Sequence, residues 1–386
     1  MESLILLGAS VRAAAFSALR AGYAPYAIDL FADRDLAAIC PAVKISRYPN
    51  DFLPALAAAP QAPWLYTGGL ENYPTLIDRL VAVRPLLGNP GAVVRRIRAV
   101  AGFGRAVQRS GCTFPTTWND GVSVGRSPAN ISPDWRWLVK PRRSCGGIGV
   151  RFASGNESRR QPRGTYLQAH VPGQSASAIF VAARNQAVLL GATRQLLGSD
   201  FDMSRPFLYV GSVGPLSLSE SELSQLHSLG NVLANQFHLV GLFNVDFVKR
   251  EDGLWPVEVN PRYSASMEII ERITGTKLID LHVQACQSGA DIPVCSTPNP
   301  GTAPFVGKAI VYTPRNCLAP KALEDLEREW NTDPRWPTLA DLPRTGDTLH
   351  AHQPVVTVFA EANTLTAVET QLRHRIATIQ RLLTDS

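Results

Sequence analysis

Residues 243–262, with the sequence FNVDFVKREDGLWPVEVNPR, consist of two alternating polar and apolar runs on either side of a Glu-Asp-Gly turn. This pattern is typical of a β-hairpin. A three-residue loop at 251–253 would place Asp246 directly opposite Glu258. Asn260 follows Glu258 by two residues and therefore shares its face, because side chains alternate along a strand.

The opposed carboxylates of Asp246 and Glu258 repel each other, which destabilises a strand pair. A divalent cation between them removes this repulsion, and Mg²⁺ takes oxygen ligands from Asp, Glu and Asn. The sequence therefore predicts a Mg²⁺ site formed by Asp246, Glu258 and Asn260. Two solvated carboxylates on the wet face of a hairpin are the alternative. Arg262 follows Pro261, which ends the strand, and an Arg at this place suits a phosphate or a carboxylate.

The composition, with 45% hydrophobic and 18% charged residues, indicates a globular protein. A chain of 386 residues is too long for a single hydrophobic core, so we expect two or three packed units. The net charge of +6 is spread along the chain, which fits small anions such as ATP, and we expect no nucleic-acid partner. The six cysteines have no metal-binding spacing and indicate reduced thiols. No apolar run is long enough to span a bilayer, and the run at residues 4–7 is too short for a signal peptide. We therefore expect a cytoplasmic protein without a membrane partner.

A second motif follows a predicted strand that ends at Lys140, where residues 144–150 read SCGGIGV. Successive glycines let backbone N–H groups approach an anion without a Cβ in the way, and a nearby Lys supplies a point charge for a phosphate. The sequence GxxxxGK[ST] is absent, so this is not a P-loop. A plain hairpin turn is the alternative interpretation of this motif. The predicted Mg²⁺ site at 246–260 favours a phosphate site, because Mg²⁺ and phosphates are commonly bound together.

The order and spacing of these motifs resemble those of the ATP-grasp enzymes. The residues that carry the resemblance are Lys140, Gly146, Gly147, Gly149, the segment 168–173, Asp246, Glu258, Asn260 and Arg262. The chain opens with a predicted strand-helix-strand unit, and the resemblance implies that it belongs to the Rossmann-like domain that the family places ahead of its ATP site. The resemblance covers roughly residues 1–290 and is strongest over 240–275.

The resemblance implies an α/β and α+β architecture with the ATP-grasp fold. We expect a Rossmann-like domain at 1–90, a first ATP-grasp lobe with the glycine-rich loop at 91–170, and a second lobe with the hairpin at 171–295. A linker separates these from a small C-terminal α+β segment at 305–386.

The resemblance also implies that ATP lies between the two lobes, with Lys140 on a phosphate, the 144–149 loop folded over the triphosphate and the segment 168–171 binding adenine through its backbone. The expected ATP-binding residues are Arg98, Lys140, Ser144, Gly146, Gly147, Gly149, Gln168, Ala169, His170, Val171 and Gln174. Two Mg²⁺ ions are implied, with Glu258 bridging them and Mn²⁺ as an alternative ion. Arg262 is the implied catalytic residue, which steadies the transferred phosphoryl group.

The chain departs from the family at three places. A Lys that often reaches the phosphates is replaced by Arg95, Arg96 or Arg98, of which we favour Arg98. The usual acidic residue of the adenine hinge is Ala169. The ribose-binding acid is replaced by Gln174 or its neighbour Ser175.

Three further pairs of residues are candidates for binding the other substrates. Ser10 and Arg12 lie where a helix N-terminus could meet an anion. Glu71 and Asn72 follow a strand at the edge where open α/β sheets bind ligands, with plain turns as the alternative. Ser264 and Ser266 follow Arg262, and outward-facing hydroxyls are their alternative role.

The implied reaction is the phosphorylation of a carboxylate by ATP followed by attack of an amine, or of a thiol, with ADP and phosphate as products. We expect a small-molecule carboxylate and a small-molecule amine as substrates. One such reaction would add an amino acid such as glutamate to a cofactor precursor. A homodimer is compatible with this expectation. A bicarbonate-dependent carboxylase of the same superfamily and a non-catalytic ATP-binding regulatory protein are the alternatives. An oxidoreductase built on residues 1–90 is disfavoured, because GxGxxG is absent.

Overall fold

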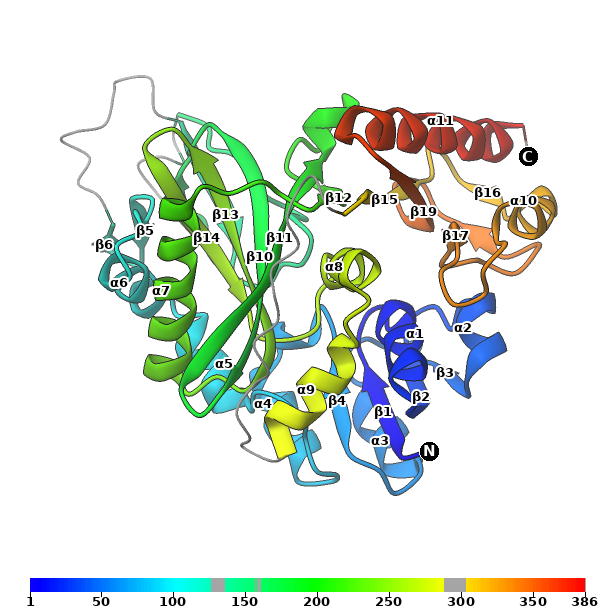
Figure 1. The fold of residues 1–386 in the computed structure, drawn as a ribbon, viewed down its shortest axis with the longest axis horizontal. Helices are drawn as coiled ribbons and strands as arrows, with labels where there is room; N and C mark the ends of the chain where they lie inside the picture. The colour runs from blue at the N-terminus through cyan, green and yellow to red at the C-terminus, as the bar shows by residue number, and fades with distance from the viewer. Residues whose placement is uncertain (126–135, 156, 158–160, 288–302, 386) are drawn as a thin grey trace.

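The computed structural model describes residues 1–125, 136–155, 157, 161–287 and 303–385, and it shows a mixed α/β protein (Figure 1). Within these residues the strands form a four-stranded, a five-stranded and an eight-stranded sheet and one two-stranded pair. None of the helices in this part of the chain is both long and apolar enough to cross a membrane. The predicted boundary at residue 295, and Cys295 itself, lie outside the described residues.

The N-terminal sheet is parallel, with the strand order β3-β2-β1-β4. Residues 4–7 are all buried, as expected for a parallel strand that is covered on both faces. The elements are β1 (Ser3–Leu7), α1 (Arg12–Ala21), β2 (Ala24–Asp29), α2 (Arg34–Ile39), β3 (Ala42–Lys44), α3 (Phe52–Ala58), β4 (Trp64–Tyr66), the 3₁₀ turn η1 (Leu70–Asn72) and α4 (Pro74–Val81).

The five-stranded sheet is antiparallel in the order β6-β5-β9-β7-β8, and the glycine-rich loop connects β7 to its neighbour β8. Two helices precede this sheet in the chain. The elements are α5 (Gly91–Ile97), α6 (Val100–Arg109), β5 (Thr117–Asn119), β6 (Val122–Val124), β7 (Trp137–Pro141), β8 (Arg151–Phe152) and β9 (Thr165–Ala169).

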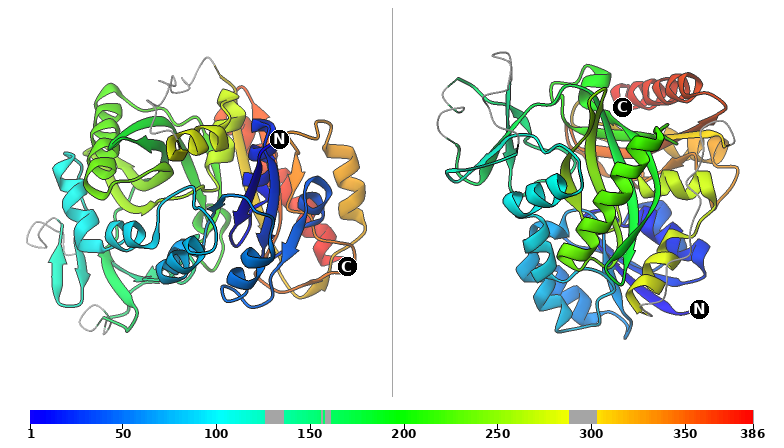
Figure 2. Two further views of the ribbon diagram at one scale, coloured as in Figure 1. Left: turned by 90° about the horizontal axis from the view of Figure 1, so that it is seen from below. Right: turned by 60° about the vertical axis from the view of Figure 1, so that its left-hand side comes forward.

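The eight-stranded sheet runs through the middle of the molecule in the order β14-β13-β10-β11-β12-β15-β19-β17 (Figures 1 and 2). Its strands are β10 (Gln174–Ala183), β11 (Gln186–Leu197), β12 (Tyr209–Gly214), β13 (Gly241–Arg250), β14 (Gly253–Asn260), β15 (Phe305–Tyr312), β17 (Leu339–Ala340) and β19 (Pro354–Ala362). The helices between and after them are η3 (Gly198–Phe201), α7 (Glu220–Phe237), α8 (Met267–Thr274), α9 (Leu278–Gln287), α10 (Ala322–Trp330) and α11 (Leu365–Thr384), and β16 (Cys317–Leu318) pairs with β18 (Thr348–Leu349).

The C-terminal segment extends this sheet, because β15 pairs with β12 and β19 pairs with β15. The tail contains both strands and helices, and its strands β15, β17 and β19 join the sheet that also carries the hairpin. On the apolar face of the sheet, α7 packs against Phe180, Phe243 and Phe247. The opposite face therefore receives the polar side chains of β13, because neighbouring residues of a strand point to opposite sides.

The hairpin of β13 and β14 places Asp246 opposite Glu258, as predicted, by a route that differs from the prediction. The turn is tighter than expected, since Arg250 pairs with Gly253 and only two residues lie between them. A two-residue turn alone would put Val257 opposite Asp246. The register shifts between Asp246 and Phe247, and this β-bulge restores the pairing of the two carboxylates.

A buried ion-pair cluster joins the N-terminal domain, α8 and the C-terminal segment. Nη1 of Arg12 lies 2.5 Å from Oε1 of Glu268, Nε of Arg12 lies 2.9 Å from Oδ1 of Asp341, and Nζ of Lys308 lies 3.1 Å from Oε2 of Glu268. Burial alone would raise the pKa of Glu268, but Arg12 and Lys308 hold it well below its usual range. The carboxylate is therefore charged and fully engaged.

We expect Glu268→Gln to lower the free energy of unfolding by roughly 3 kcal/mol, because it leaves the buried Arg12 and Lys308 without their shared anion. Chemical denaturation measures this difference. Asp325→Asn, which removes an ion pair with Arg328 that is largely exposed, is the control and should change stability little. Equal effects of the two substitutions would contradict a central role for the buried cluster.

Candidate functional site

Glu258 of the hairpin lines a cavity, and Asp246 lies opposite it across the strand pair. The environments of the two carboxylates differ. Asp246 is partly buried, and burial together with the charge of Glu258 raises its pKa to about 7. Glu258 is 36% exposed, and its Oε1 lies 3.7 Å from Nη2 of Arg98. Asp246 therefore carries an unfavourable charge that a bound cation would stabilise.

Two further polar residues, which the sequence analysis did not select, contact Asp246. Nε2 of Gln195 on β11 donates to Oδ1 of Asp246 at 2.9 Å, and Nδ2 of Asn244 donates to the same oxygen at 2.8 Å. Oδ1 of Asn244 is buried and has no hydrogen-bond partner among the described residues. Asn244 precedes Asp246 by two residues, so the alternation of the strand already placed it on this face. Gln195 gave no such signal, because only the order of the strands brings β11 near β13.

The donor set suits Mg²⁺, which prefers carboxylate and amide oxygens and retains several waters. Nδ2 of Asn260 donates to Oδ2 of Asp246 at 3.2 Å, and Oδ1 of Asn260 accepts from Nη2 of Arg262 at 3.1 Å. A half-turn of this amide would bring its oxygen to the carboxylates. No group of three or more His, Cys, Asp and Glu side chains with metal-binding geometry occurs in the described part of the chain. The site instead combines two carboxylates with amide oxygens.

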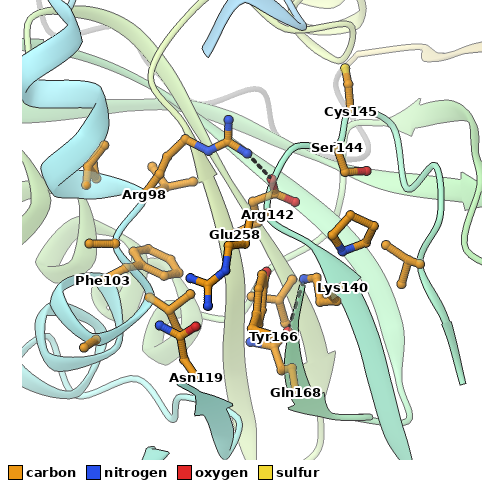
Figure 3. Close-up of a pocket in the computed structure, with 18 of the residues that line it drawn as sticks. Arg98, Phe103, Asn119, Lys140, Arg142, Ser144, Cys145, Tyr166, Gln168 and Glu258 are labelled. Carbon is orange, nitrogen blue, oxygen red and sulfur yellow. Dashed lines mark hydrogen bonds and ion pairs between the residues drawn. The ribbon is translucent and has the colours of Figure 1, made fainter. Parts of the chain in front are cut away.

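Lys140 lies at the end of β7 and faces the hairpin across a cavity of about 340 Å³ (Figure 3). Its Nζ donates to Oε1 of Gln168 at 3.1 Å. Burial would lower the pKa of Lys140, but Tyr166, Glu258 and Asp246 outweigh burial and raise it above its ordinary value. The ammonium group is therefore charged and available to a phosphate.

Of the three candidate arginines, Arg98 comes close to Glu258, and it also lines the cavity (Figure 3). Arg95 lines the cavity too, but its Nη2 bonds to Asp78 at 2.8 Å. Arg96 bonds to the backbone oxygen of Gln236. The structure thus leaves Arg98 nearest to the carboxylates.

The glycine-rich loop is folded against β12 and the segment that precedes it. The backbone N–H of Tyr209 donates to the oxygen of Gly146 at 2.9 Å, and Oγ of Ser144 donates to the oxygen of Ile148 at 2.6 Å. Gly146, Gly147 and Gly149 have φ values of 60°, 76° and 79°, in the left-handed region that glycine favours. The loop therefore depends on its glycines for its shape.

The predicted adenine hinge contributes less to the cavity than expected. Gln168 lines it, whereas the N–H of Ala169 donates to Thr116 and the N–H of His170 donates to Arg136, both at 2.8 Å. These amides are already bonded because β9 continues its ladder to this point. Val171 is buried in a small cluster with Val248 and Trp255. Gln174 is exposed at the start of β10.

The catalytic candidate Arg262 is buried and bonds to Glu71 of the N-terminal domain. Its Nε and Nη2 lie 3.1 and 2.7 Å from Oε1 of Glu71. Asn72 connects two other parts of the site, since its Nδ2 donates to the oxygen of Ser144 at 3.1 Å and its Oδ1 accepts from Arg98 at 2.9 Å. The loop after β4 thus brings the N-terminal domain, the glycine-rich loop and the hairpin together.

The remaining substrate candidates lie further from the cavity or are already engaged. The guanidinium of Arg12 bonds to Glu268 and Asp341, so contact with a substrate would require one of these ion pairs to open. Ser10 is exposed, and its backbone oxygen accepts from Thr67. Ser264 and Ser266 are buried with their hydroxyl oxygens 3.3 Å apart, which removes the alternative of outward-facing hydroxyls. The five described cysteines are free thiols, as predicted.

We expect the affinity for Mg²⁺ to fall about tenfold for each pH unit below pH 7, because Asp246, with a pKa of about 7, must then lose a proton to bind the ion. Isothermal titration calorimetry between pH 6 and pH 8 measures this dependence. Asp252→Asn, at the tip of the hairpin, should leave the profile unchanged. Binding that does not vary with pH would exclude Asp246 as a ligand.

We expect Gly147→Ala to increase the hydrogen-exchange rate of the amides in residues 144–150 much more than Gly146→Ala does. A Cβ at Gly147 would lie 1.9 Å from the backbone oxygen of Phe207, whereas at Gly146 the nearest atom is 3.8 Å away. Both glycines have positive φ, so the backbone cost is matched. Equal rates would show that the contact with Phe207 does not hold the loop.

Comparisons with known proteins agree with this geometry. Residues 105–266, which include Lys140, the glycine-rich loop, the hairpin and Arg262, match the model of a family described as ATP-grasp domain. Over 65 residues the chain is 34% identical to the carbamoyl phosphate synthase large chain of Agathobacter rectalis, a match that spans 17% of this chain and 6% of that protein.

Three solved structures share the fold over almost the whole chain. N5-carboxyaminoimidazole ribonucleotide synthetase from Thermus thermophilus has a TM-score of 0.68 at 15% identity, covering 99% of this chain and 98% of that one. The L-amino acid ligase from Bacillus licheniformis has a TM-score of 0.67 at 13% identity, covering 97% and 96%. The biotin carboxylase domain of 2-oxoglutarate carboxylase from Hydrogenobacter thermophilus, a dimer in complex with MgADP and bicarbonate, has a TM-score of 0.66 at 14% identity, covering 97% and 89%. Residues 105–266 thus match an ATP-grasp domain, and the chain as a whole shares the fold of these three structures.

Proposed function

We propose that this protein is an ATP-dependent ligase that phosphorylates a carboxylate and joins the resulting acyl phosphate to an amine, with ADP and phosphate as products. One observation supports this function above the others. Lys140, Arg98, the glycine-rich loop and Glu258 line one cavity, and Asp246 lies opposite Glu258 on the hairpin. Cations and backbone amides suit a triphosphate, and the carboxylates suit its metal ion.

In this proposal Lys140, Arg98 and the amides of residues 144–149 bind the phosphates. Asp246, Glu258 and Asn260 would hold Mg²⁺, which neutralises developing negative charge when it is bound. Asn244 joins them as a candidate ligand. Gln168 faces the nucleotide, while the base must be recognised by groups other than the N–H groups of Ala169 and His170, which already have partners.

Arg262 acts where charge develops during phosphoryl transfer. Its guanidinium is buried beside Asn260, and Glu71 holds it in place. One such contact, made mainly in the transition state, contributes roughly 3–4 kcal/mol. The contribution of the protein is thus the placement of the reactants and the stabilisation of charge.

The acid and the amine are the open part of the proposal. The similarity to an L-amino acid ligase supports an amino acid as one substrate, and we extend this to the addition of an amino acid such as glutamate to a cofactor precursor. The similarity to N5-carboxyaminoimidazole ribonucleotide synthetase and to a biotin carboxylase domain supports the second candidate, in which bicarbonate is the acid. The dimer of that domain also supports a homodimer of this chain.

Incubation with Mg-ATP separates these functions. The ligase is supported if ADP forms only when an extract of small molecules is added and mass spectrometry detects a new conjugate. The carboxylase is supported if ADP formation requires added bicarbonate. AMP and pyrophosphate would overturn both, because neither follows from an acyl phosphate. Nucleotide binding without turnover under either condition would favour a regulatory protein.

We expect Glu258→Gln to reduce ADP formation by at least about a thousandfold while leaving the fold intact, because it removes a metal ligand and relieves a like-charge pair. Glu251→Gln is the matched control, since Glu251 is an exposed glutamate in the turn of the same hairpin. Circular dichroism checks the fold and a coupled ADP assay measures turnover. Activity that survives in Glu258→Gln would exclude the proposed metal site.

A further inference from the structure

A series of three buried hydrogen bonds crosses the five-stranded sheet and ends at Lys140. Nζ of Lys140 donates to Oε1 of Gln168 at 3.1 Å, and Nε2 of Gln168 donates to Oγ1 of Thr117 at 3.1 Å. Oγ1 of Thr117 in turn donates to the backbone oxygen of Pro115 at 2.8 Å. The side chains of Lys140, Gln168 and Thr117 are all buried. The proposed phosphate-binding group is thus connected to the backbone just before β5.

The register of the sheet brings these three side chains onto one face. Gln168 of β9 lies directly opposite Thr117 of β5 on one side and opposite Leu138 of β7 on the other. Lys140 follows Leu138 by two residues and therefore shares its face, and long side chains reach diagonal neighbours across a strand pair. Figure 3 shows the bond between Lys140 and Gln168 at the cavity. The contacts follow from the pairing of three strands.

The two ends of the series fix the direction of every hydrogen bond in it. The ammonium group of Lys140 can only donate, and the carbonyl oxygen of Pro115 can only accept. The hydroxyl of Thr117 therefore gives its single hydrogen to Pro115 and offers a lone pair to Gln168. The amide of Gln168 must then turn its nitrogen toward Thr117 and its oxygen toward Lys140.

The orientation of this amide determines where the ammonium group of Lys140 points. A reversed amide would set the N–H donors of Gln168 against those of Lys140, with like partial charges facing each other. In the observed orientation one of the three N–H donors of Lys140 is directed at Gln168, which sets the directions of the other two. The ammonium group is thereby fixed before a nucleotide arrives, and a group that is fixed in advance loses less freedom when its ligand binds.

We propose that Thr117 and Gln168 are positioning residues of the nucleotide site, which act on the phosphates of ATP through Lys140. Thr117 orients the amide of Gln168, and Gln168 holds the ammonium group. The inference rests on the proposed function, in which Lys140 binds a phosphate. It goes beyond that function by assigning a role to Thr117, a buried residue that does not itself line the cavity.

Thr117→Val tests the inference, because it keeps the shape of the side chain and removes the hydroxyl that orients Gln168. Thr117→Ser, which keeps the hydroxyl, is the conservative variant. Thr116→Val is the matched control, since Oγ1 of the neighbouring Thr116 is also buried but has no hydrogen-bond partner in the part of the chain that the structure describes. Isothermal titration calorimetry with ATP and Mg²⁺, without any other substrate, measures the affinity of each variant.

We expect Thr117→Val to weaken the binding of ATP about five- to tenfold, which is the effect of losing one hydrogen bond. Thr117→Ser and Thr116→Val should bind ATP as the unmodified protein does, and circular dichroism checks that every variant is folded. Equal affinities of Thr117→Val and the unmodified protein would overturn the inference. So would an equal loss in Thr116→Val, which would show that any change in β5 disturbs the site.

A double-mutant cycle shows whether Thr117 acts through Lys140. Lys140→Met removes the ammonium group and should weaken ATP binding at least about tenfold, because a hydrogen bond to a charged group is lost. Adding Thr117→Val to Lys140→Met should cause no further loss, since no ammonium group is left to position. A loss of the same size in both backgrounds would indicate a general effect on the fold and reject the positioning role.

These binding measurements do not depend on turnover, so they separate the inference from the proposed function. Coupled effects of Thr117 and Lys140 on ATP binding, in a protein that forms no ADP under any condition, would support the positioning role and reject the ligase. ADP formation with an unchanged KM for ATP in Thr117→Val would leave the ligase standing and reject the positioning role.

Discussion

The opposition of Asp246 and Glu258 across the hairpin is the constraint on which the rest of the site depends. Two carboxylates at one position of a strand pair are unfavourable in the bare protein, as the raised pKa of Asp246 shows. A tight two-residue turn alone would have separated them, and a β-bulge restores their pairing. The chain therefore maintains a costly arrangement that becomes favourable when a cation binds.

The contact between Arg262 and Glu71 has a comparable role for the architecture. It ties the end of the hairpin to the loop after β4, and Asn72 extends the connection to the glycine-rich loop and Arg98. Three segments that are far apart in the sequence thus share one set of hydrogen bonds. A change in any one of these three segments would move the guanidinium of Arg262, whose position the proposed chemistry requires.

The frame that holds these loops is itself charged. Arg12, Glu268, Lys308 and Asp341 form a buried cluster between the N-terminal domain, α8 and the C-terminal segment. Such clusters cost desolvation energy and depend on complete pairing, so they favour one relative position of the parts they join. The C-terminal strands add to this frame by extending the central sheet rather than by forming a separate unit.

The sequence by itself determined the hairpin, the strand-helix-strand opening, the glycine-rich loop after Lys140 and the resemblance to an ATP-grasp domain, because these depend on local alternation, turn residues and short spacings. It also placed Asp246, Glu258 and Asn260 on one face. Only the tertiary structure decided that Arg12 is paired with acidic residues in an ion-pair cluster. It also decided that the backbone N–H groups of Ala169 and His170 donate hydrogen bonds within the protein. It alone brought Gln195 to Asp246 and Arg262 to Glu71. The physical reason is that these contacts follow from the order of strands in the sheets and from the packing of distant segments, which no local pattern of residues records.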